Sequence, residues 1–161
     1  MSNLKSVTSS QQLIATRKWT QGMGMMSINA HIDIKHDLKY RPMYSELIYI
    51  QLSKSVNSSY DTDNAISLKA DVQQLFMMAA GLKELIQIKY GKSDYTHKGV
   101  NGSIIKELCL KAGKSFFINV SSGEGVSFGI SFDKYEMVGL YKQIELLAEH
   151  VAKKVFEIQS S

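Results

Sequence analysis

Two apolar segments of the chain each carry an aromatic ring and a side-chain amide two residues apart. Tyr49 and Gln51 lie in the first segment, and Phe117 and Asn119 lie in the second. Because successive side chains of a strand point to opposite faces, each ring and its amide share the face that the flanking aliphatic residues leave free. An exposed ring stacks on a nucleic-acid base for about 1–3 kcal/mol, and an amide can hydrogen-bond a base edge. The pattern predicts two stacking platforms.

A second interpretation of these rings stays open. Outward aromatic side chains of a sheet also pack against another sheet or a partner subunit, which is the alternative for Tyr49 and Phe117. Trp19 and Tyr95 are open in a similar way, because each can be a turn or edge residue that shields the core.

Lysines on the neighbouring segments can flank the predicted platforms. Lys18, Lys35 and Lys69 suit this position, whereas Lys106 has the wrong strand parity unless its strand contains a bulge. The candidate nucleic-acid-binding residues are Lys18, Trp19, Lys35, Tyr49, Gln51, Lys54, Lys69, Lys92, Tyr95, Lys98, Lys114, Phe117 and Asn119.

The charge of the whole chain favours polyanions only mildly. Nineteen Lys and Arg residues oppose fifteen Asp and Glu residues, which gives a net charge of +4. Only Arg17 and Arg41 are arginine. Lysine acts as a point charge on phosphate, whereas recognition of guanine edges favours the arginine fork. The balance indicates attraction to a backbone more than sequence recognition, although an AT-rich genome alone also produces a lysine bias.

The chain contains an internal repeat. The segments Ile48–Leu52 and Phe116–Val120 are each followed by a polar, turn-prone stretch and then by Ala65–Leu68 or Gly129–Phe132, which share an Ile-Ser-apolar match. Both copies then lead into an amphipathic helical pattern. The order strand, hairpin, strand, helix therefore occurs twice.

The two predicted helices have the same spacing of apolar residues. From Val72 in one and Met137 in the other, apolar side chains follow at +3, +4, +7, +10 and +14. Asp71 and Asp133 occupy the expected N-cap positions.

Two further strands fit upstream of each copy, so the predicted fold is α+β. It consists of two ββββα repeats, each a four-stranded antiparallel sheet backed by a helix. The added strands are Leu13–Gln21, Met26–Lys35, Ile88–Tyr95 and Ser103–Lys111. The predicted boundaries are a flexible N-terminus at 1–12, one domain at 13–158 with repeats at 13–88 and 89–158, and a flexible C-terminus at 159–161.

This organisation resembles the Whirly family. The resemblance covers roughly residues 13 to 158 and rests on the Ile48–Leu52 and Phe116–Val120 patterns with their hairpins and helices. Related folds are the kinetoplastid guide-RNA-binding proteins and, as a single dimerising repeat, positive cofactor 4. The resemblance implies crossed sheets, helices at the centre of a tetramer, and single strands on the open sheets. The plant family's Lys-Gly-Lys-Ala-Ala-Leu motif is absent, which leaves DNA versus RNA open.

The helices also predict self-association. The segment Phe76–Leu82 is apolar around most of its circumference, so one sheet cannot cover it. Gly81 and Gly139 are costly in helix interiors, and close approach of a neighbouring helix would explain them. We expect a homo-oligomer, in the tetrameric form through helices 71–88 and 133–158. A two-layer monomer with an apolar helix is the alternative.

The sequence offers no recognisable catalytic or metal-binding set. The four histidines lack metal-ligand spacing, and Asp61–Asn64 lacks the glycine and distal glutamate of a calcium loop. Cys109 cannot form an internal disulfide and is expected in the core. We therefore expect no enzyme activity, no cofactor and no metal.

Two functions remain in view. The first is single-stranded nucleic-acid binding with low specificity, preferably of DNA, in replication, recombination or transcription. The second is a protein-interaction module of the same architecture, and guide-RNA-type RNA binding is a further alternative. With no signal peptide or spanning segment in the sequence, we expect an intracellular protein in the cytoplasm, nucleoid, an organelle or, for a viral protein, the host cell.

Overall fold

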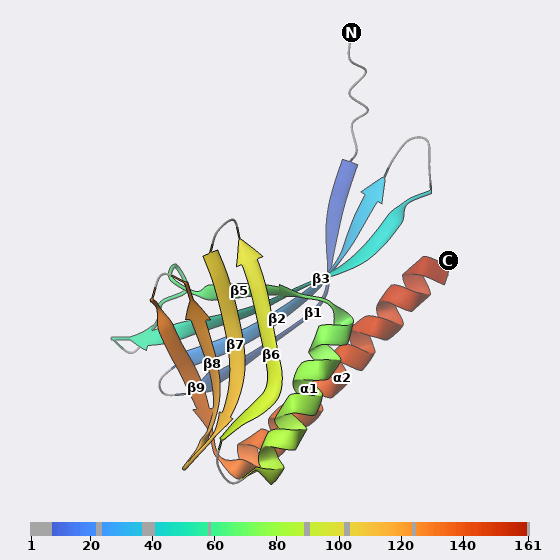
Figure 1. Cartoon of the computed structure of the whole chain (residues 1–161). Helices are drawn as coiled ribbons and strands as arrows, with labels where there is room; N and C mark the ends of the chain where they lie inside the picture. The colour runs from blue at the N-terminus through green and yellow to red at the C-terminus, as the bar shows by residue number, and fades with distance from the viewer. Residues whose placement is uncertain are drawn as a thin grey trace.

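A computed structural model of the chain contains two antiparallel sheets and two helices in an α+β arrangement (Figure 1). The structure describes residues 8–21, 24–36, 41–57, 59–88, 91–101, 104–123 and 125–160. The first sheet contains β1 (Thr8–Gln21), β2 (Gly24–His36), β3 (Met43–Val56), the two-residue β4 (Ser59–Tyr60) and β5 (Ile66–Ala70). The second contains β6 (Gly91–Asn101), β7 (Ile104–Ala112), β8 (Phe116–Ser122) and β9 (Ser127–Phe132), and the helices are α1 (Val72–Gln87) and α2 (Lys134–Ser160).

The strand order repeats between the two sheets. In the first sheet β2 pairs with β1 and β3, and β3 pairs with β5, while β4 adds a short pairing at the end of β3. In the second sheet β6, β7, β8 and β9 lie in chain order. The predicted layout of four main strands followed by a helix, present twice, is confirmed at this level.

The sheets cross each other and share one core. In Figure 1 the strands of the second sheet run across those of the first, and β9 contacts β1, β2 and β3. Side chains alternate between the two faces of each strand, and those on the inner faces are aliphatic. Ile28 and Ile50 are fully buried in the first sheet, as are Leu110 and Ile118 in the second. Each sheet therefore keeps its other face outside this core.

The helices lie side by side, but each packs mainly beyond its own sheet (Figure 1). Helix α1 follows β5 of the first sheet and packs on β6 and β7, whereas α2 packs along β1 and β3 as well as beside β9. This differs from the predicted sheet backed by its own helix. The reason is that the crossed sheets cover each other over only part of their inner faces, and the helices cover inward-facing residues that remain, such as Leu110 at α1 and Trp19 at α2.

Both helices begin with the predicted aspartate caps. The Gln74 backbone nitrogen donates to Asp71 Oδ1 at 2.7 Å, and the Asp71 nitrogen donates to Gln74 Oε1 at 2.9 Å. Asp133 and Glu136 form the same reciprocal pair at 2.8 and 3.1 Å. These capping boxes satisfy backbone donors at the first turn of each helix.

The caps correct the predicted alignment of the repeats. Ala70 and Phe132 directly precede the two N-caps, and they pair with Ile48 and Phe116. Leu68-Lys69-Ala70 is therefore the counterpart of Ile130-Ser131-Phe132, and the Ile-Ser match is displaced by two residues. The equal helix spacings are likewise displaced, by nearly one turn, since Val72 follows its cap by one residue and Met137 follows its cap by four.

Several predicted boundaries differ from the structure. Strand β1 begins at Thr8, inside the segment expected to be flexible, because Thr8–Leu13 pairs with the end of β2. Helix α2 continues to Ser160, beyond the expected end at 158. Residue 88 caps α1 instead of starting a strand, and β6 begins at Gly91, whose φ of 130° suits glycine.

Within the described residues, neither helix combines the length and apolar character that crossing a membrane requires.

Candidate nucleic-acid interface

The open face of the first sheet carries the predicted ring and amide. Ile48, Ile50 and Leu52 are buried in the core, so Tyr49 and Gln51 project from the opposite side of β3. Both are partly exposed. The outward orientation predicted from strand parity is confirmed.

The residues that pair with this ring and amide are polar. Tyr49 lies between Asn29 of β2 and Lys69 of β5. Gln51 lies between Ser27 and Ser67, and the row of Gln51 continues through Ser27 to Lys18 on the edge strand β1. Lys18 and Lys69 are exposed at opposite edges of the sheet. The platform therefore has a ring and an amide at its centre and one cation on either side.

His31 borders the same face. Its ring meets Tyr49 edge-on, with the ring centroids 6.2 Å apart and the planes at 75°. On its own row it lies between Leu13 and Leu47. His31 Nδ1 is buried and has no hydrogen-bond partner within the described part of the chain. The His31 ring therefore supports the Tyr49 ring from one side, and His31 Nδ1 is a buried polar atom without a hydrogen bond.

The second sheet has a pocket on its open face. Phe117 and Asn119 project from β8 away from the buried Ile118 and Val120. Phe117 lies between Lys111 and Ser131, and Asn119 lies between Cys109 and Gly129. The pocket has a volume of about 410 Å³ and is lined by Lys111, Phe117, Asn119, Gly129 and Ser131. It combines an aromatic wall, a cation, an amide and a hydroxyl.

Gly129 makes room for the amide in this pocket. A Cβ at residue 129 would overlap Asn119 Oδ1 and lie 3.0 Å from Asn119 Cγ. The Asn119 side chain therefore lies directly over the glycine. Cys109, which was expected in the core, is buried on this same face beside Asn119, because β7 places Leu108 and Leu110 on the inner side. Lys111 was missed by sequence analysis, although its alternation with Leu110 indicates the open face.

The remaining lysines contribute unequally. Lys98 lies 3.8 Å from Glu107 across β6 and β7, so its charge is partly balanced. Lys106 has the inner parity, as expected, and its Nζ donates to the Ser67 backbone oxygen at 3.0 Å. Lys35 is exposed at the far end of β2, Lys54 at the end of β3, and Lys114 in the turn before β8. Lys92 lies in β6, and its side chain is outside the described residues.

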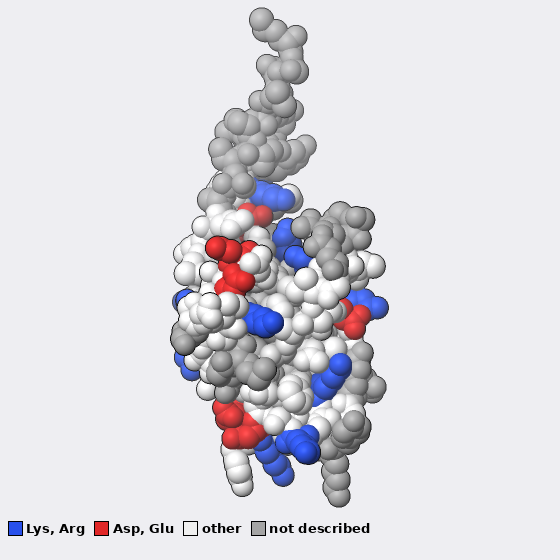
Figure 2. Space-filling view, turned by 90° about the vertical axis from the view of Figure 1, so that its left-hand side faces the viewer, with Lys and Arg blue, Asp and Glu red and all other residues white. Residues whose placement is uncertain are grey.

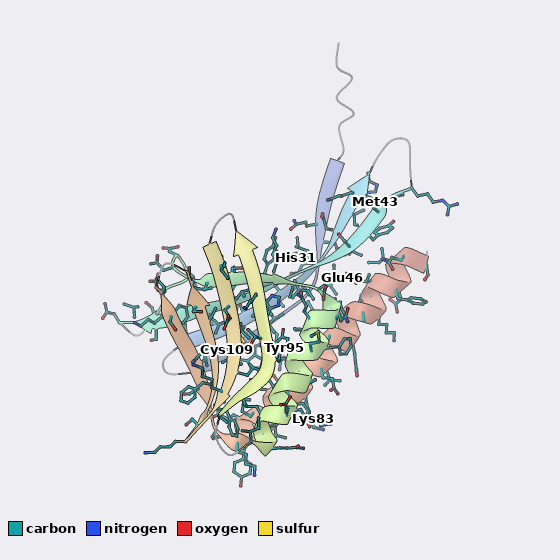
Figure 3. All side chains as sticks on the ribbon, in the orientation of Figure 1. His31, Met43, Glu46, Lys83, Tyr95 and Cys109 are labelled. Atoms are coloured by element: carbon teal, nitrogen blue, oxygen red, sulfur yellow. The ribbon has the colours of Figure 1, made fainter. Side chains whose placement is uncertain are left out.

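Two of the predicted aromatic residues do not face the open sheets. Trp19 Nε1 donates to Gln143 Oε1 of α2 at 2.7 Å, which places the indole on the helix side of β1. Tyr95 lies between β6 and α1 (Figure 3), where its hydroxyl donates to the Gln74 backbone oxygen at 3.3 Å. Burial, with a smaller effect of the Asp71 carboxylate, raises the pKa of Tyr95 to about 12. Both rings support helix packing, which strand alternation alone could not distinguish.

Charge is distributed in separate groups. In the view of Figure 2 the lysine and arginine side chains lie apart, with uncharged and acidic surface between them. Across the described residues, no group of three or more His, Cys, Asp or Glu side chains is arranged to hold a metal ion. The candidate site therefore consists of rings, amides and dispersed lysines.

Compared with protein-family models and with curated protein sequences, the chain matches none.

Proposed function

We propose that this chain binds single-stranded nucleic acid, DNA in preference, with low sequence specificity and through the two open sheet faces. The observation that carries the proposal is the recurrence of one arrangement: Tyr49 with Gln51, and Phe117 with Asn119, at equivalent positions of two sheets. A lysine is the strand partner of the aromatic residue in both sheets: Lys69 is paired with Tyr49, and Lys111 is paired with Phe117. The two lysines lie on opposite sides of their aromatic residues. Every base has a face that can stack, so such a site tolerates any sequence.

The energetic argument favours stacking over charge. Each base stacked on a ring contributes about 1–3 kcal/mol. Dispersed lysines add attraction that weakens as salt rises, because bound phosphates release counterions. A duplex hides its base faces within the stack, and it therefore cannot use Tyr49 or Phe117. We accordingly expect single strands to bind more tightly than duplexes.

The Whirly-like resemblance supports a role in replication, recombination or transcription and a homotetramer joined through the helices. Phe76 and Met77 of α1 are 36% and 49% exposed, and Phe156 of α2 is 70% exposed. Large apolar side chains exposed in such numbers on helices are typical of an interface. We propose that these helix surfaces are where copies of the chain associate.

A protein-interaction module remains the second candidate. Leu13 and Met43, which lie toward the far end of the first sheet, are 54% and 67% exposed. They favour a protein contact at that end, beside the unsatisfied His31. A protein partner would use this apolar end, whereas nucleic acid would use the ring and amide rows.

The test is fluorescence anisotropy with labelled oligo-dT, oligo-U and a duplex at two salt concentrations. Tyr49→Ala and Phe117→Ala should each weaken single-strand binding about 5- to 140-fold, which corresponds to about 1–3 kcal/mol. Tyr135→Ala is the matched control, because Tyr135 is an exposed aromatic residue on α2. Equal binding by all three variants and the unaltered chain, or no binding of any oligonucleotide, would refute the sheet-face proposal.

A further inference from the structure

A groove runs between the edge strand β1 and helix α2, on the opposite side of β1 from the open face of the first sheet. It consists of two adjoining pockets, of about 410 and about 350 Å³, that share Arg17 and Gln143. The first pocket also involves Lys18, Trp19 and Gly139, and the second extends to His150. The groove therefore follows the strand along several residues.

The side chains of β1 divide between the two faces of the sheet. Arg17 and Trp19 pair with the inward-facing Ile28 and Met26, whereas Lys18 pairs with Ser27 on the open face. Trp19 Nε1 donates to Gln143 Oε1 at 2.7 Å, and Arg17 Nη2 approaches the same oxygen at 3.4 Å. Gln143 thus holds the indole and the guanidinium together along the groove, with Lys18 just across the strand.

The groove is open at Gly139. Apart from its two chain neighbours and the backbone of its own helix, no atom of the described residues lies within 4 Å of where a Cβ at Gly139 would be. By contrast, a Cβ at Gly81 would lie 2.9 Å from Tyr95 Cβ and 3.0 Å from Leu110 Cδ1. Packing within this chain therefore explains the glycine in α1 and leaves the glycine in α2 beside unfilled space. A glycine inside a helix costs about 1 kcal/mol relative to alanine.

The charges at the groove favour an anionic occupant. Arg17 and Lys18 are both exposed, and Glu136 is the carboxylate that lines the first pocket. Glu136 is engaged in the α2 cap, where its Oε1 accepts the Asp133 backbone N–H. A guanidinium binds phosphate through two parallel hydrogen bonds and also stacks on planar rings, and an indole stacks on bases. These are the groups that a nucleotide requires.

We propose that the β1–α2 groove is a second subsite of the nucleic-acid-binding surface. A single strand crossing the open face of the first sheet passes Lys18, turns over the edge strand β1 and places its next nucleotides beside Arg17 and Trp19. A single strand can cross the outer edge of β1, because within the described residues β1 pairs with β2 alone. The inference rests on the proposed function and adds a prediction of its own: the groove is used only by strands long enough to continue beyond the sheet.

Trp19 supplies a direct readout, because it is the only tryptophan in the chain. Oligo-dT of about 4 nucleotides and of about 16 nucleotides, the range of site sizes found for small single-strand-binding domains, should be titrated while Trp19 fluorescence and anisotropy are both recorded. The longer oligonucleotide should quench Trp19, and the shorter one should bind without quenching.

Variants separate the groove from the sheet face. Arg17→Ala should weaken binding of the longer oligonucleotide about tenfold, lower its salt slope by about 1, and leave the shorter one within about twofold. Lys83→Ala removes an exposed cation from α1 and is the matched control (Figure 3). Gly139→Leu should block the groove and abolish quenching, while Gly139→Ala, which adds only one carbon, should retain it. Thermal denaturation of each variant checks that the fold is intact.

The outcomes distinguish the two proposals. Tight binding of both oligonucleotides with unchanged Trp19 fluorescence, and an Arg17→Ala variant that behaves like Lys83→Ala, would overturn the groove and leave the sheet-face function standing. No binding of either oligonucleotide would overturn both. Quenching by an acidic peptide that equals quenching by the longer oligonucleotide would replace the nucleotide subsite with a protein-docking groove.

Discussion

Gly81 and Gly139 each occupy an interior position of a helix, yet the structure gives opposite predictions for replacing them with alanine. A Cβ at Gly81 would lie 2.9 Å from Tyr95 Cβ, which cannot rotate away because it is fixed to the backbone of β6. Overpacking of this kind costs about 1–3 kcal/mol, and the better helix propensity of alanine returns about 1 kcal/mol. Gly81→Ala should therefore destabilise the chain by up to about 2 kcal/mol.

Gly139→Ala should have the opposite sign. Beyond its chain neighbours and its own helix backbone, the Cβ would meet no atom of the described residues within 4 Å, so only the propensity gain of about 0.5–1 kcal/mol applies. The two variants should differ by about 2 kcal/mol although the chemical change is identical. Urea unfolding followed by circular dichroism measures this difference as a change in midpoint at constant slope.

Protein concentration must be the same for both variants, because self-association would add a concentration-dependent stability. Equal midpoints for Gly81→Ala and Gly139→Ala would show that β6 does not approach α1 as closely as the structure has it. A loss of stability in both variants would place a further surface against Gly139. Either result would refute the reasoning.

Three other changes have distinct expected outcomes. Gly129→Ala should displace the Asn119 amide from its pocket and weaken single-strand binding, measured by anisotropy, about fivefold, which corresponds to the loss of about one hydrogen bond. Unchanged binding would show that Asn119 does not contact the nucleic acid. Burial raises the pKa of Tyr95 from 10.0 to about 12, so the stability that the neutral Tyr95 side chain contributes should be complete below pH 10 and lost as pH rises through about 12. The Tyr95→Phe variant should lose less stability than the unaltered chain across this pH range, as measured by the midpoint of urea unfolding. Asp133→Ala should cost about 1 kcal/mol in urea unfolding, and Asp133→Asn, which keeps an acceptor, should cost less.

The sequence predicted the features that depend on neighbouring residues, namely strand faces and helix starts. Strand alternation placed Tyr49 and Phe117 outward, and Asp71 and Asp133 marked the helix starts. The faces of β1 were not predictable in this way, because Arg17, Lys18 and Trp19 give no apolar alternation. A register shift between Leu13 and Ala15 changes the parity partway along the same strand. Only the tertiary position of α2 decides that Trp19 belongs to the helix side.

Helix placement was equally beyond the sequence pattern. The apolar stripe from Val72 to Ile86 shows that α1 must be covered, but it does not say by what. Gly81 was expected to allow a neighbouring helix, and instead it allows Tyr95 and Leu110 of the second sheet. The covering surface comes from a segment that follows the helix in the chain. Such long-range choices depend on how the two sheets cross, which no single segment encodes.

The two open faces share a ring and an amide but differ in the strands that flank them. Corrected by the N-caps, Lys69 of β5 corresponds to Ser131 of β9, and Asn29 of β2 corresponds to Lys111 of β7. The lysine therefore lies on the β5 side of Tyr49 in the first repeat and on the β7 side of Phe117 in the second. Either position leaves an ammonium next to the ring, where it can meet the phosphate of a stacked nucleotide. A site that depended on a fixed cation position would not tolerate this exchange, whereas low-specificity stacking on both faces requires only the ring, the amide and a nearby positive charge.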